Sequence, residues 1–203
     1  MIVLGLTGSI AMGKSKAAAA LRRLGLPMHD SDAEVHRLLS TNNAAVAAVA
    51  AAFPGAVRDG AVDRRELGRR VFADPAALRR LEAILHPLVR RAQRRFLARA
   101  AAARRSLVVL DIPLLFETGA QRNCDAIVAV TAPRFVQLAR LHRRQGMTAQ
   151  WLAGVEARQT PDREKRRRAD FVVPTGLDRR TSLRALARIV RVLRRTSRGR
   201  RHA

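Results

Sequence analysis

Residues 8–15 of this chain read Gly-Ser-Ile-Ala-Met-Gly-Lys-Ser, which is the spacing of a phosphate-binding loop, or P-loop. An apolar stretch at 2–4 precedes the loop and a helix-forming run at 16–24 follows it, so a strand, a loop and a helix are predicted in succession. Glycine lets backbone N–H groups approach a phosphate closely, and the helix adds the positive end of its dipole. Lys14 is then placed for the β- and γ-phosphates of a nucleotide, and Ser15 for Mg²⁺. Because all eight positions and both flanking elements fit, we interpret the segment as a nucleotide site rather than as a glycine-rich turn that binds nothing.

The other apolar segments predict an α/β fold around this loop. Further strands are expected to end at Asp30 and to span 107–111, 126–130 and 171–173. Continuous apolar runs are typical of a parallel sheet that is buried on both faces. Helical patterns fill the intervals between the strands, and a last helix is expected to start at 181 or 182. We therefore predict a five-stranded parallel sheet flanked by helices, within a single domain.

The net charge of +24 raises the question of a nucleic-acid partner. Only three of the 40 basic residues are lysines, alanine is abundant and tyrosine is absent, which is typical of a coding bias that places arginine on solvent faces. Aromatic residues make up 3% of the chain, so platforms for stacking bases are few. We expect no specific nucleic-acid partner.

The apolar residues do not predict a membrane protein. No run of 18 apolar residues is free of charge, and the first residues enter a strand without a basic leader, so neither a transmembrane helix nor a signal peptide is expected. Cys124 is the only cysteine, which excludes an internal disulfide, and we expect it to be a packing residue rather than a nucleophile. The expected location is the cytoplasm, with no membrane partner.

Carboxylates follow two of the predicted strands. Asp30 and Asp32 flank a serine at the end of the second strand, and in an open α/β sheet this is the edge where ligands bind. Capping of the next helix would explain one acidic residue but not two, so we interpret this pair of carboxylates as the place of a catalytic base. Asp111 ends the strand at 107–111 in the position of a Walker B carboxylate, which holds Mg²⁺ directly or through water.

The stretch between the second and third strands is helical in pattern. A turn is expected at 58–60, Asp63 is expected to cap one helix, and Asp74 is expected to precede a longer one. Pro87 is predicted to interrupt that longer helix, because proline lacks a backbone donor and clashes with the preceding turn. On pattern alone, His86 is a packed histidine at this kink rather than a ligand contact.

Two further features are open to two interpretations each. Glu117, in the apolar loop after 107–111, is either a substrate contact or a solvated charge. Arg140 and Arg144 lie four residues apart in a predicted helix, so they share a face and can converge on one anion. In an arginine-rich chain such a pair also arises by chance, but beside a P-loop it suits a lid that neutralises a transferred phosphoryl group.

With these residues in place, the sequence resembles the dephospho-coenzyme A kinase family of P-loop small-molecule kinases. The resemblance covers about 2–176. The P-loop alone fits many kinases, whereas the whole ordered set is far more specific. The set consists of Leu6-Thr7-Gly8 through Lys14-Ser15, Asp30-Ser31-Asp32, Asp59-Gly60 with Arg64, Phe72, Leu81-Glu82 with His86-Pro87, Pro113-Leu114-Leu115 with Glu117, Gln137 with Arg140 and Arg144, and Gln159 eleven residues before Asp170.

The resemblance implies a three-part kinase. Its parallel-sheet core would span about 1–32, 105–132 and 169–195, its helical coenzyme A-binding subdomain about 33–104, and its lid about 133–168. A basic tail at 196–203 would follow and is expected to be frayed, together with the basic end of the last helix from 194.

The same resemblance implies ATP-dependent phosphorylation of the ribose 3′-hydroxyl of dephospho-coenzyme A, which gives coenzyme A. Asp32 would deprotonate this hydroxyl, while Lys14, Arg140 and Arg144 would stabilise the phosphoryl group in flight. The other implied contacts are Gly8, Ala11, Met12, Gly13, Lys14, Ser15 and Lys16 for ATP; Asp32, Arg64, His86, Pro113, Leu114 and Glu117 for the acceptor; and Ser15, with Asp111 by its position, for Mg²⁺.

Some positions depart from the family pattern. Lys16 stands where the family prefers a hydroxyl residue, and Ser9, Ala11 and Met12 replace loop residues that are usually small or glycine. Met12 is therefore expected to alter the packing of the loop or its affinity for nucleotide. The segment 174–176 is shorter than the family's adenine-binding segment, which leaves the contacts to the base open.

Two alternative functions remain at this point. One is another small-molecule P-loop kinase, for instance one acting on a nucleoside monophosphate, which would not need the His86-Pro87 insertion together with Pro113-Leu114-Leu115. The other is an arginine-rich P-loop ATPase that binds nucleic acid, which would show steeply salt-dependent binding.

Overall fold

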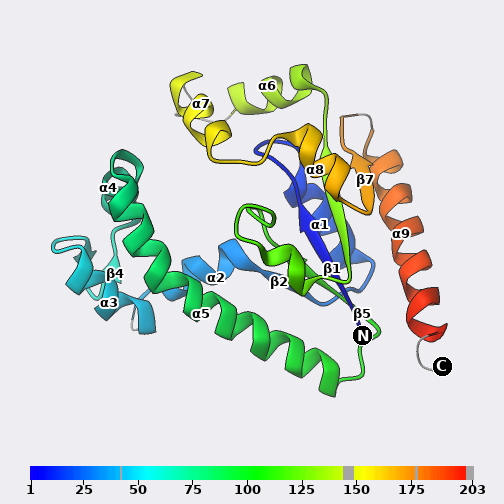
Figure 1. Ribbon diagram of the computed structural model, residues 1–203, viewed down its shortest axis with the longest axis horizontal. Coiled ribbons are helices and arrows are strands. Elements are labelled where there is room, and N and C mark those ends of the chain that lie inside the picture. The colour runs from blue at the N-terminus through cyan, green and yellow to red at the C-terminus, as the bar shows by residue number, and fades with distance from the viewer. Residues whose placement is uncertain (42, 144–148, 177, 200–203) are drawn as a thin grey trace. The chain divides into compact units, whose positions relative to one another are not determined.

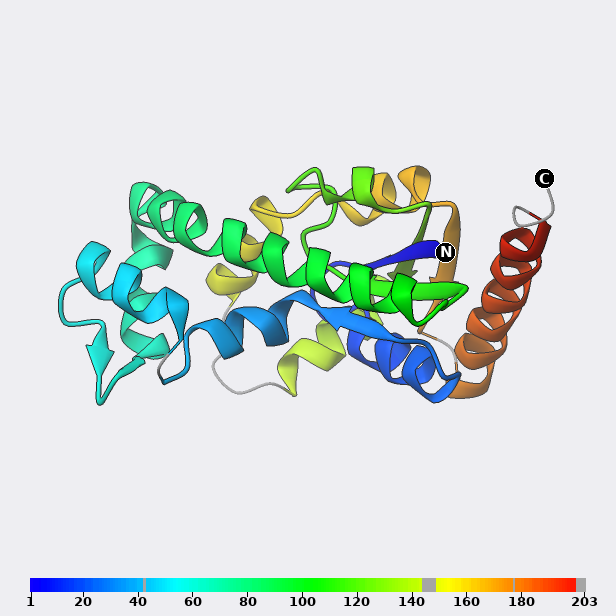
Figure 2. The same cartoon turned by 90° about the horizontal axis from the view of Figure 1, so that it is seen from below.

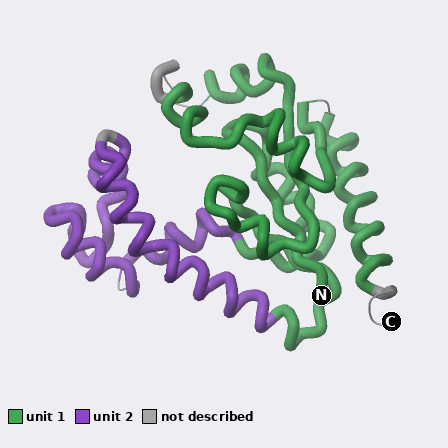
Figure 3. The backbone as a smooth tube through the Cα atoms, in the orientation of Figure 1, with its two compact units in different colours: residues 1–29, 100–203 green, residues 30–99 purple. Residues whose placement is uncertain are grey.

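The computed structural model describes residues 1–41, 43–143, 149–176 and 178–199 (Figure 1). The chain forms two compact units (Figure 3). The core unit comprises 1–29 and 100–203, and the helical unit comprises 30–99. Among the described residues, no helix is both long enough and apolar enough to cross a bilayer.

The core unit is built on a five-stranded sheet with the strand order β2-β5-β1-β6-β7. The strands are β1 (Ile2–Thr7), β2 (Met28–Asp30), β5 (Leu107–Asp111), β6 (Ala126–Thr131) and β7 (Phe171–Pro174). Strand β1 pairs in parallel with β5 and β6, and β6 pairs in parallel with β7, in the registers Ile2↔Leu107, Leu4↔Ala126 and Val128↔Phe171. Every residue of β5 is buried, as its unbroken apolar sequence predicts. The five-stranded α/β fold is confirmed.

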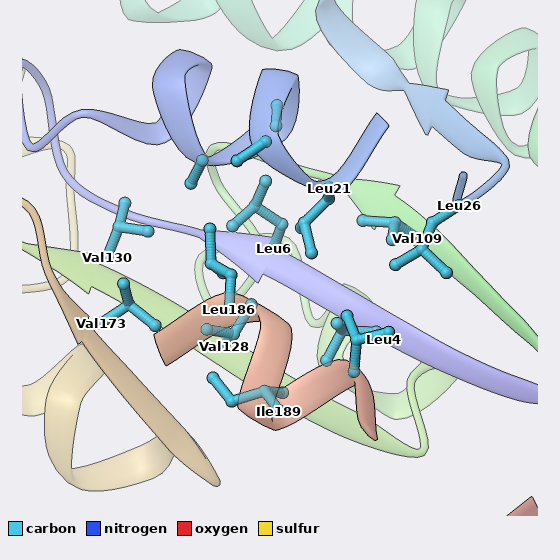
Figure 4. Packing of buried hydrophobic residues seen from close by; sticks show 14 of the residues in the cluster. Leu4, Leu6, Leu21, Leu26, Val109, Val128, Val130, Val173, Leu186 and Ile189 are labelled. Atoms are coloured by element: carbon cyan, nitrogen blue, oxygen red, sulfur yellow. The ribbon is translucent and has the colours of Figure 1, made fainter. Parts of the chain in front are cut away.

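Helices α1 (Lys14–Arg23) and α9 (Arg179–Gly199) lie next to each other on one face of this sheet. Leu21 of α1 and Leu186 and Ile189 of α9 are buried against the β1 side chains Leu4 and Leu6 (Figure 4). The remaining helical elements of the core unit are η1 (Ala120–Asn123), α6 (Arg134–His142), α7 (Ala149–Ala157) and α8 (Asp162–Arg168). The main hydrophobic core therefore fixes the strand and the helix that flank the P-loop.

Helix α9 is longer at both ends than the sequence predicts. It begins at Arg179, where Asp178 accepts a hydrogen bond from the backbone N–H of Thr181 at 2.7 Å. It continues to Gly199, so the predicted fraying is wrong for 194–199, and the rest of the predicted tail, 200–203, lies outside the described residues. The reason lies in its last turns, where Ser197 is buried and its hydroxyl donates to the carbonyl oxygen of Ser106 at 3.2 Å.

The helical unit has its own hydrophobic cluster, which includes Leu38, Val49, Phe53, Leu67 and Leu81. Its elements are α2 (Ser31–Leu38), α3 (Ala44–Ala52), the antiparallel hairpin of β3 (Val57–Arg58) and β4 (Ala61–Val62), α4 (Arg64–Ala73) and α5 (Pro75–Ala102), whose last residues belong to the core unit.

The turns and caps of the helical unit follow the predictions. Asp59 and Gly60 both have positive φ in the turn of the hairpin, where the sequence predicts a turn. The Asp63 side chain accepts hydrogen bonds from two N–H groups in the first turn of α4, so the predicted cap is confirmed. Asp74 likewise accepts from the N–H of Ala76 at the start of α5.

Helix α5 runs for 28 residues without a break (Figure 2). The predicted interruption at Pro87 is therefore wrong. A proline inside a helix costs about 3 kcal/mol, because one hydrogen bond is lost and the ring crowds the preceding turn. Leu81 and Leu85 are buried on the N-terminal side of the proline, and burying each side chain contributes about 1.5–3 kcal/mol. Packing of this apolar face is thus large enough to offset the cost of Pro87.

Candidate active site

The P-loop connects β1 to α1 at the carboxyl edge of the sheet, where sequence analysis places it. Gly13 precedes α1 with a φ of 91°, and a Cβ atom there would lie 2.7 Å from Thr175 Oγ1. A Cβ atom at Gly8 would collide with the Val130 side chain. Both glycines are therefore required by close approach, and Gly13 also by its left-handed backbone.

Substituting alanine at Gly13 is expected to weaken ATP binding by at least tenfold. The added methyl group forces Thr175 away and strains a residue at a φ of 91°. Calorimetric titration with ATP measures this loss, and Gly25→Ala is the matched control. Gly25 also has positive φ, at 77°, but a Cβ atom there would meet nothing within 4 Å. Equal ATP affinities of Gly13→Ala and Gly25→Ala would contradict the prediction.

Ala11 has a φ of 59°, which is unusual for a residue other than glycine. This left-handed conformation costs about 1–2 kcal/mol for an L-residue. The cost persists only where surrounding contacts fix the backbone. In this loop such contacts are made by side chains from distant parts of the core unit.

Three consecutive carbonyl oxygens of the P-loop each accept a hydrogen bond from a side chain. Gln137 Nε2 donates to the oxygen of Ile10 at 3.0 Å, Arg140 NH1 to that of Ala11 at 3.0 Å, and Thr175 Oγ1 to that of Met12 at 2.5 Å. The donors come from α6 and from the segment after β7. These carbonyls are therefore occupied by side chains, while the first N–H groups of α1, which have no partner within the helix, are placed to bind an anion.

Lys14 and Asp111 form an ion pair beside the loop. Lys14 Nζ lies 2.7 Å from Asp111 Oδ1, and Asp111 is 2% exposed. The pairing of β1 with β5 brings the two predicted site residues together, because Asp111 ends β5 next to the strand that leads into the loop. An ammonium group has three N–H donors, so two remain for phosphate oxygens.

Arg140 lies at the P-loop, where a phosphate-stabilising arginine was predicted. Besides the Ala11 carbonyl, its guanidinium donates to the carbonyl and the hydroxyl oxygens of Thr175, at 2.5 and 3.1 Å. Burial lowers the pKa of Arg140 below its ordinary value, although a guanidinium stays charged at any physiological pH. Arg144, its predicted companion, lies outside the described residues.

Met12 fills space inside the protein rather than toward solvent. It is buried in the main hydrophobic cluster, and its Sδ atom accepts a hydrogen bond from the N–H of Ala132 at 3.2 Å. The large side chain that departs from the family pattern is thereby accommodated within the core. Lys16 and Ser15, in contrast, are exposed in the first turn of α1.

Glu117 is not a freely solvated charge, and its Oε1 atom is already engaged by other residues of the protein. Its Oε1 atom lies 2.9 Å from Lys165 Nζ and accepts a hydrogen bond from the N–H of Thr160 at 2.7 Å. Lys165 is completely buried. Burial raises the pKa of Glu117, but the ammonium group of Lys165 and hydrogen bonds from backbone N–H groups outweigh it and hold the pKa below its ordinary value. The carboxylate joins the loop after β5 to the start of α8.

The other loop residues predicted to contact the acceptor lie in the same stretch. The carbonyl oxygen of Pro113 accepts a hydrogen bond from the Thr7 hydroxyl at 3.0 Å, which ties the loop to the end of β1. Leu114 is 36% exposed and therefore has free apolar surface. The loop presents a leucine to solvent next to a backbone that is held against the P-loop strand.

The remaining predicted acceptor residues belong to the helical unit. Asp32 is exposed in the first turn of α2, whose cap is Asp30, since Asp30 Oδ1 accepts from the N–H of Ala33 at 3.0 Å. Capping therefore does not account for Asp32. Arg64 NH1 lies 2.9 Å from Nδ1 of His36, and His86 is half-buried in α5.

Cys124 has no chemical role at this site. Burial, and then the neighbouring Asp125, raise the pKa of its thiol to about 12. At neutral pH it is therefore a neutral packing residue, and its Sγ atom would lie 2.8 Å from a Cβ atom placed on Gly5.

Two cavities of the core unit border the P-loop. One of about 370 Å³ lies between α1, the start of α9 and the segment after β7; its lining includes Lys16, Ala20, Arg140, Thr175 and Asp178. A larger one of about 670 Å³ reaches Ser9 and Met12 of the loop, and its lining includes Arg134, Gln137, Gln159 and Arg166.

Sequence analysis missed three residues of this arrangement. Gln137 was part of a motif without a role, Thr175 was part of a segment that departs from the family pattern, and Lys165 was not singled out. Lys165 did carry a signal, because it is one of only three lysines among 40 basic residues and the other two lie in or next to the P-loop motif. Gln137 and Thr175 carry no local signal, since their partners lie 127 and 163 positions away.

Comparisons with known proteins find one family over most of the chain. A family model described as dephospho-CoA kinase matches residues 2–177. A dephospho-CoA kinase of Paramagnetospirillum magneticum is 64% identical over 166 residues, which cover 82% of this chain and 78% of the relative. One of Rhodospirillum rubrum is 57% identical over 187 residues, covering 91% and 88%.

Solved structures share the fold over almost the whole chain. TT1252 from Thermus thermophilus has a TM-score of 0.82 at 37% identity, with 94% of this chain and 96% of that chain covered. A dephospho-CoA kinase from Campylobacter jejuni has a TM-score of 0.70 at 22% identity, with 98% of each chain covered, and at that identity it supports the fold alone.

Proposed function

The chain belongs to the dephospho-CoA kinase family, and we propose from this that it transfers the γ-phosphoryl group of ATP to the ribose 3′-hydroxyl of dephospho-CoA. The structural observation that carries the proposal is the Lys14–Asp111 ion pair beside a P-loop whose carbonyls are occupied by side chains. That combination places the Lys14 ammonium group and the first N–H groups of α1 where they can bind a polyphosphate.

In the proposed reaction, Asp32 takes the proton of the 3′-hydroxyl as its oxygen attacks the γ-phosphorus. The bond between the γ-phosphorus and the β,γ-bridging oxygen breaks, and ADP leaves. Lys14 binds the transferred group, while Arg140 and Arg144 neutralise the charge that develops on its oxygens. Arg140 then has to exchange at least part of its hydrogen bonding to Ala11 and Thr175 for the phosphates.

The residues at the P-loop fit a magnesium ion. Mg²⁺ prefers oxygen ligands and is usually held by one or two carboxylates, substrate phosphates and water. The structure offers the exposed hydroxyl of Ser15 and the carboxylate of Asp111, and in the described ranges no three His, Cys, Asp or Glu side chains gather as a self-sufficient metal site. When bound, the ion would neutralise phosphate charge. Ser15 and Asp111 would hold it.

The 370 Å³ cavity is the proposed binding site of the adenine. It runs from Lys16 and Ala20 of α1 to Arg140 and Thr175, and a guanidinium beside an apolar wall suits a nucleobase. This assigns to Thr175 part of the role that the family's longer segment performs.

The family membership supports four proposed contacts to the acceptor, dephospho-CoA. Arg64 and His86 are the proposed contacts in the helical unit, and Pro113 and Leu114 are those in the core unit. Glu117 is proposed to support that loop through Lys165 rather than to contact the substrate. The subdomain boundaries, the role of Mg²⁺ and the cytoplasmic location stay predictions.

The decisive experiment offers the purified protein ATP, Mg²⁺ and dephospho-CoA and measures coenzyme A by chromatography. Coenzyme A should form in proportion to ADP. Parallel reactions with a nucleoside monophosphate test the rival kinase, and added RNA or DNA tests an ATPase that nucleic acid stimulates. Absence of coenzyme A while ATP binds would overturn the proposal.

A further inference from the structure

Gln137 and Gln159 hold both polar backbone groups of a single P-loop residue. Gln137 Nε2 donates to the carbonyl oxygen of Ile10 at 3.0 Å, and Gln159 Oε1 accepts from the N–H of Ile10 at 3.1 Å. Gln137 is 2% exposed in α6, and Gln159 follows α7. Two segments far away in the sequence therefore converge on one residue of the loop.

Each of the two glutamines is itself held in place. Gln137 Oε1 accepts a hydrogen bond from Arg134 NH1 at 2.7 Å, so both ends of its amide are engaged. The N–H of Thr160, the residue after Gln159, donates to Glu117 Oε1 at 2.7 Å. The completely buried Lys165 lies 2.9 Å from the same oxygen. Arg134 therefore positions the amide of Gln137, and the Glu117–Lys165 ion pair positions the backbone next to Gln159.

The loop needs such support directly after Ile10. Ala11, the next residue, has a φ of 59°, which an alanine does not adopt without constraint. Without these contacts, the backbone of Ala11 would relax toward negative φ. The neighbouring peptide groups would then rotate out of the conformation that they have before the start of α1. ATP would then have to restore this arrangement, at the expense of its affinity.

We propose that Gln137 and Gln159 are positioning residues that hold the P-loop in its phosphate-binding conformation before ATP arrives. They act through the Ile10 peptide groups, whose hydrogen bonds they already occupy. The inference rests on the proposed function only in requiring that the P-loop bind a nucleotide.

The test uses the full-length chain with Gln137→Met, Gln159→Met and both together. Methionine keeps the length of the side chain and removes the amide. Each single variant is expected to weaken ATP binding about three- to tenfold, the usual effect of one lost hydrogen bond. The double variant should lose less than the product of the two, because both amides hold the same residue. Affinity for dephospho-CoA should stay within about twofold of wild type.

Gln121→Met is the matched control, because Gln121 Oε1 is buried and accepts no hydrogen bond from the described residues. Calorimetry gives the affinities for ATP and dephospho-CoA separately, and thermal unfolding of the ligand-free proteins shows whether each variant is folded. Gln159 is only half-buried, so Gln159→Met remains a test if Gln137→Met does not fold.

Unchanged ATP affinity in the folded variants would overturn the inference. Equal losses for ATP and dephospho-CoA would also overturn it, since they would indicate a general structural role. Failure of the wild type to form coenzyme A while it binds ATP would refute the proposed function but leave the positioning test valid.

Discussion

Replacing Asp32 with asparagine is expected to lower kcat for coenzyme A formation by about 10²–10⁴-fold, the usual contribution of a general base. Asparagine has the size of aspartate but cannot accept the proton of the 3′-hydroxyl. Asp32 is exposed, and Asp30 rather than Asp32 caps α2, so the change removes no cap. Steady-state kinetics measures kcat, and calorimetry should give an ATP affinity within about twofold of wild type.

Asp74→Asn is the matched control for this prediction. Asp74 also lies in the helical unit and caps α5 through the N–H of Ala76. Asparagine caps a helix as well as aspartate does, so kcat should stay near the wild-type value. A near-wild-type kcat for Asp32→Asn would remove Asp32 as the base.

The second large effect is expected at the buried ion pair. Lys165→Met should lower the free energy of unfolding by about 3–5 kcal/mol, the cost of removing one partner of a buried pair. Lys165 is completely buried and the Glu117 side chain is only 14% exposed, so water compensates poorly for the lost ammonium group. Denaturant unfolding measures the change.

Two further variants define the origin of this loss. Adding Glu117→Gln to Lys165→Met should restore much of the stability, because glutamine removes the unpaired charge and still accepts from the N–H of Thr160. Arg69→Met breaks an ion pair with Glu66 in which the arginine side chain is 77% exposed, so its loss of stability should be much smaller than that of Lys165→Met. Similar losses in Lys165→Met and Arg69→Met would contradict the prediction.

The ion pair also predicts a pH dependence. In the wild type the pKa of Glu117 is held below its ordinary value, so its contribution to stability is present above that ordinary value and is lost as the pH falls through the lowered one. In Lys165→Met the burial of Glu117 persists without the ammonium group, so its pKa rises and protonation relieves the buried charge. The difference in stability between wild type and variant should therefore shrink as the pH falls. A difference that grows toward acid pH would contradict this account.

Most of the sheet was predictable because its signals are local. The apolar run at 107–111 and the Asp111 at its end predict a buried strand and a carboxylate at the ligand edge, and both are observed. The prediction at Pro87 also used a local signal, namely that proline interrupts a helix, and it was wrong because α5 continues through this residue. The leucines that keep α5 intact act through a core whose other members lie up to dozens of residues away.

Site residues were predictable where the type of side chain and its place in a motif indicate one chemical role. Lys14 and Asp111 were each predicted for this site, and their ion pair follows from the pairing of β1 with β5. The side chains that bind the loop's carbonyls were not predictable. A glutamine at 137 or a threonine at 175 can serve in many ways, and only the fold, which brings α6 and the segment after β7 to the P-loop, gives them their partners.

Strand β1 is synthesised well before its partners in the sheet. It pairs with 107–111 and 126–129, so at about 5–20 residues per second it waits roughly 5–20 s for its first neighbour. By then the helical unit, with its separate core drawn from 38–85, has already been synthesised. The strand that carries the phosphate-binding loop therefore stays unpaired while the whole helical unit is synthesised. During that interval both edges of this apolar strand are open, and unpaired edges favour pairing with other chains.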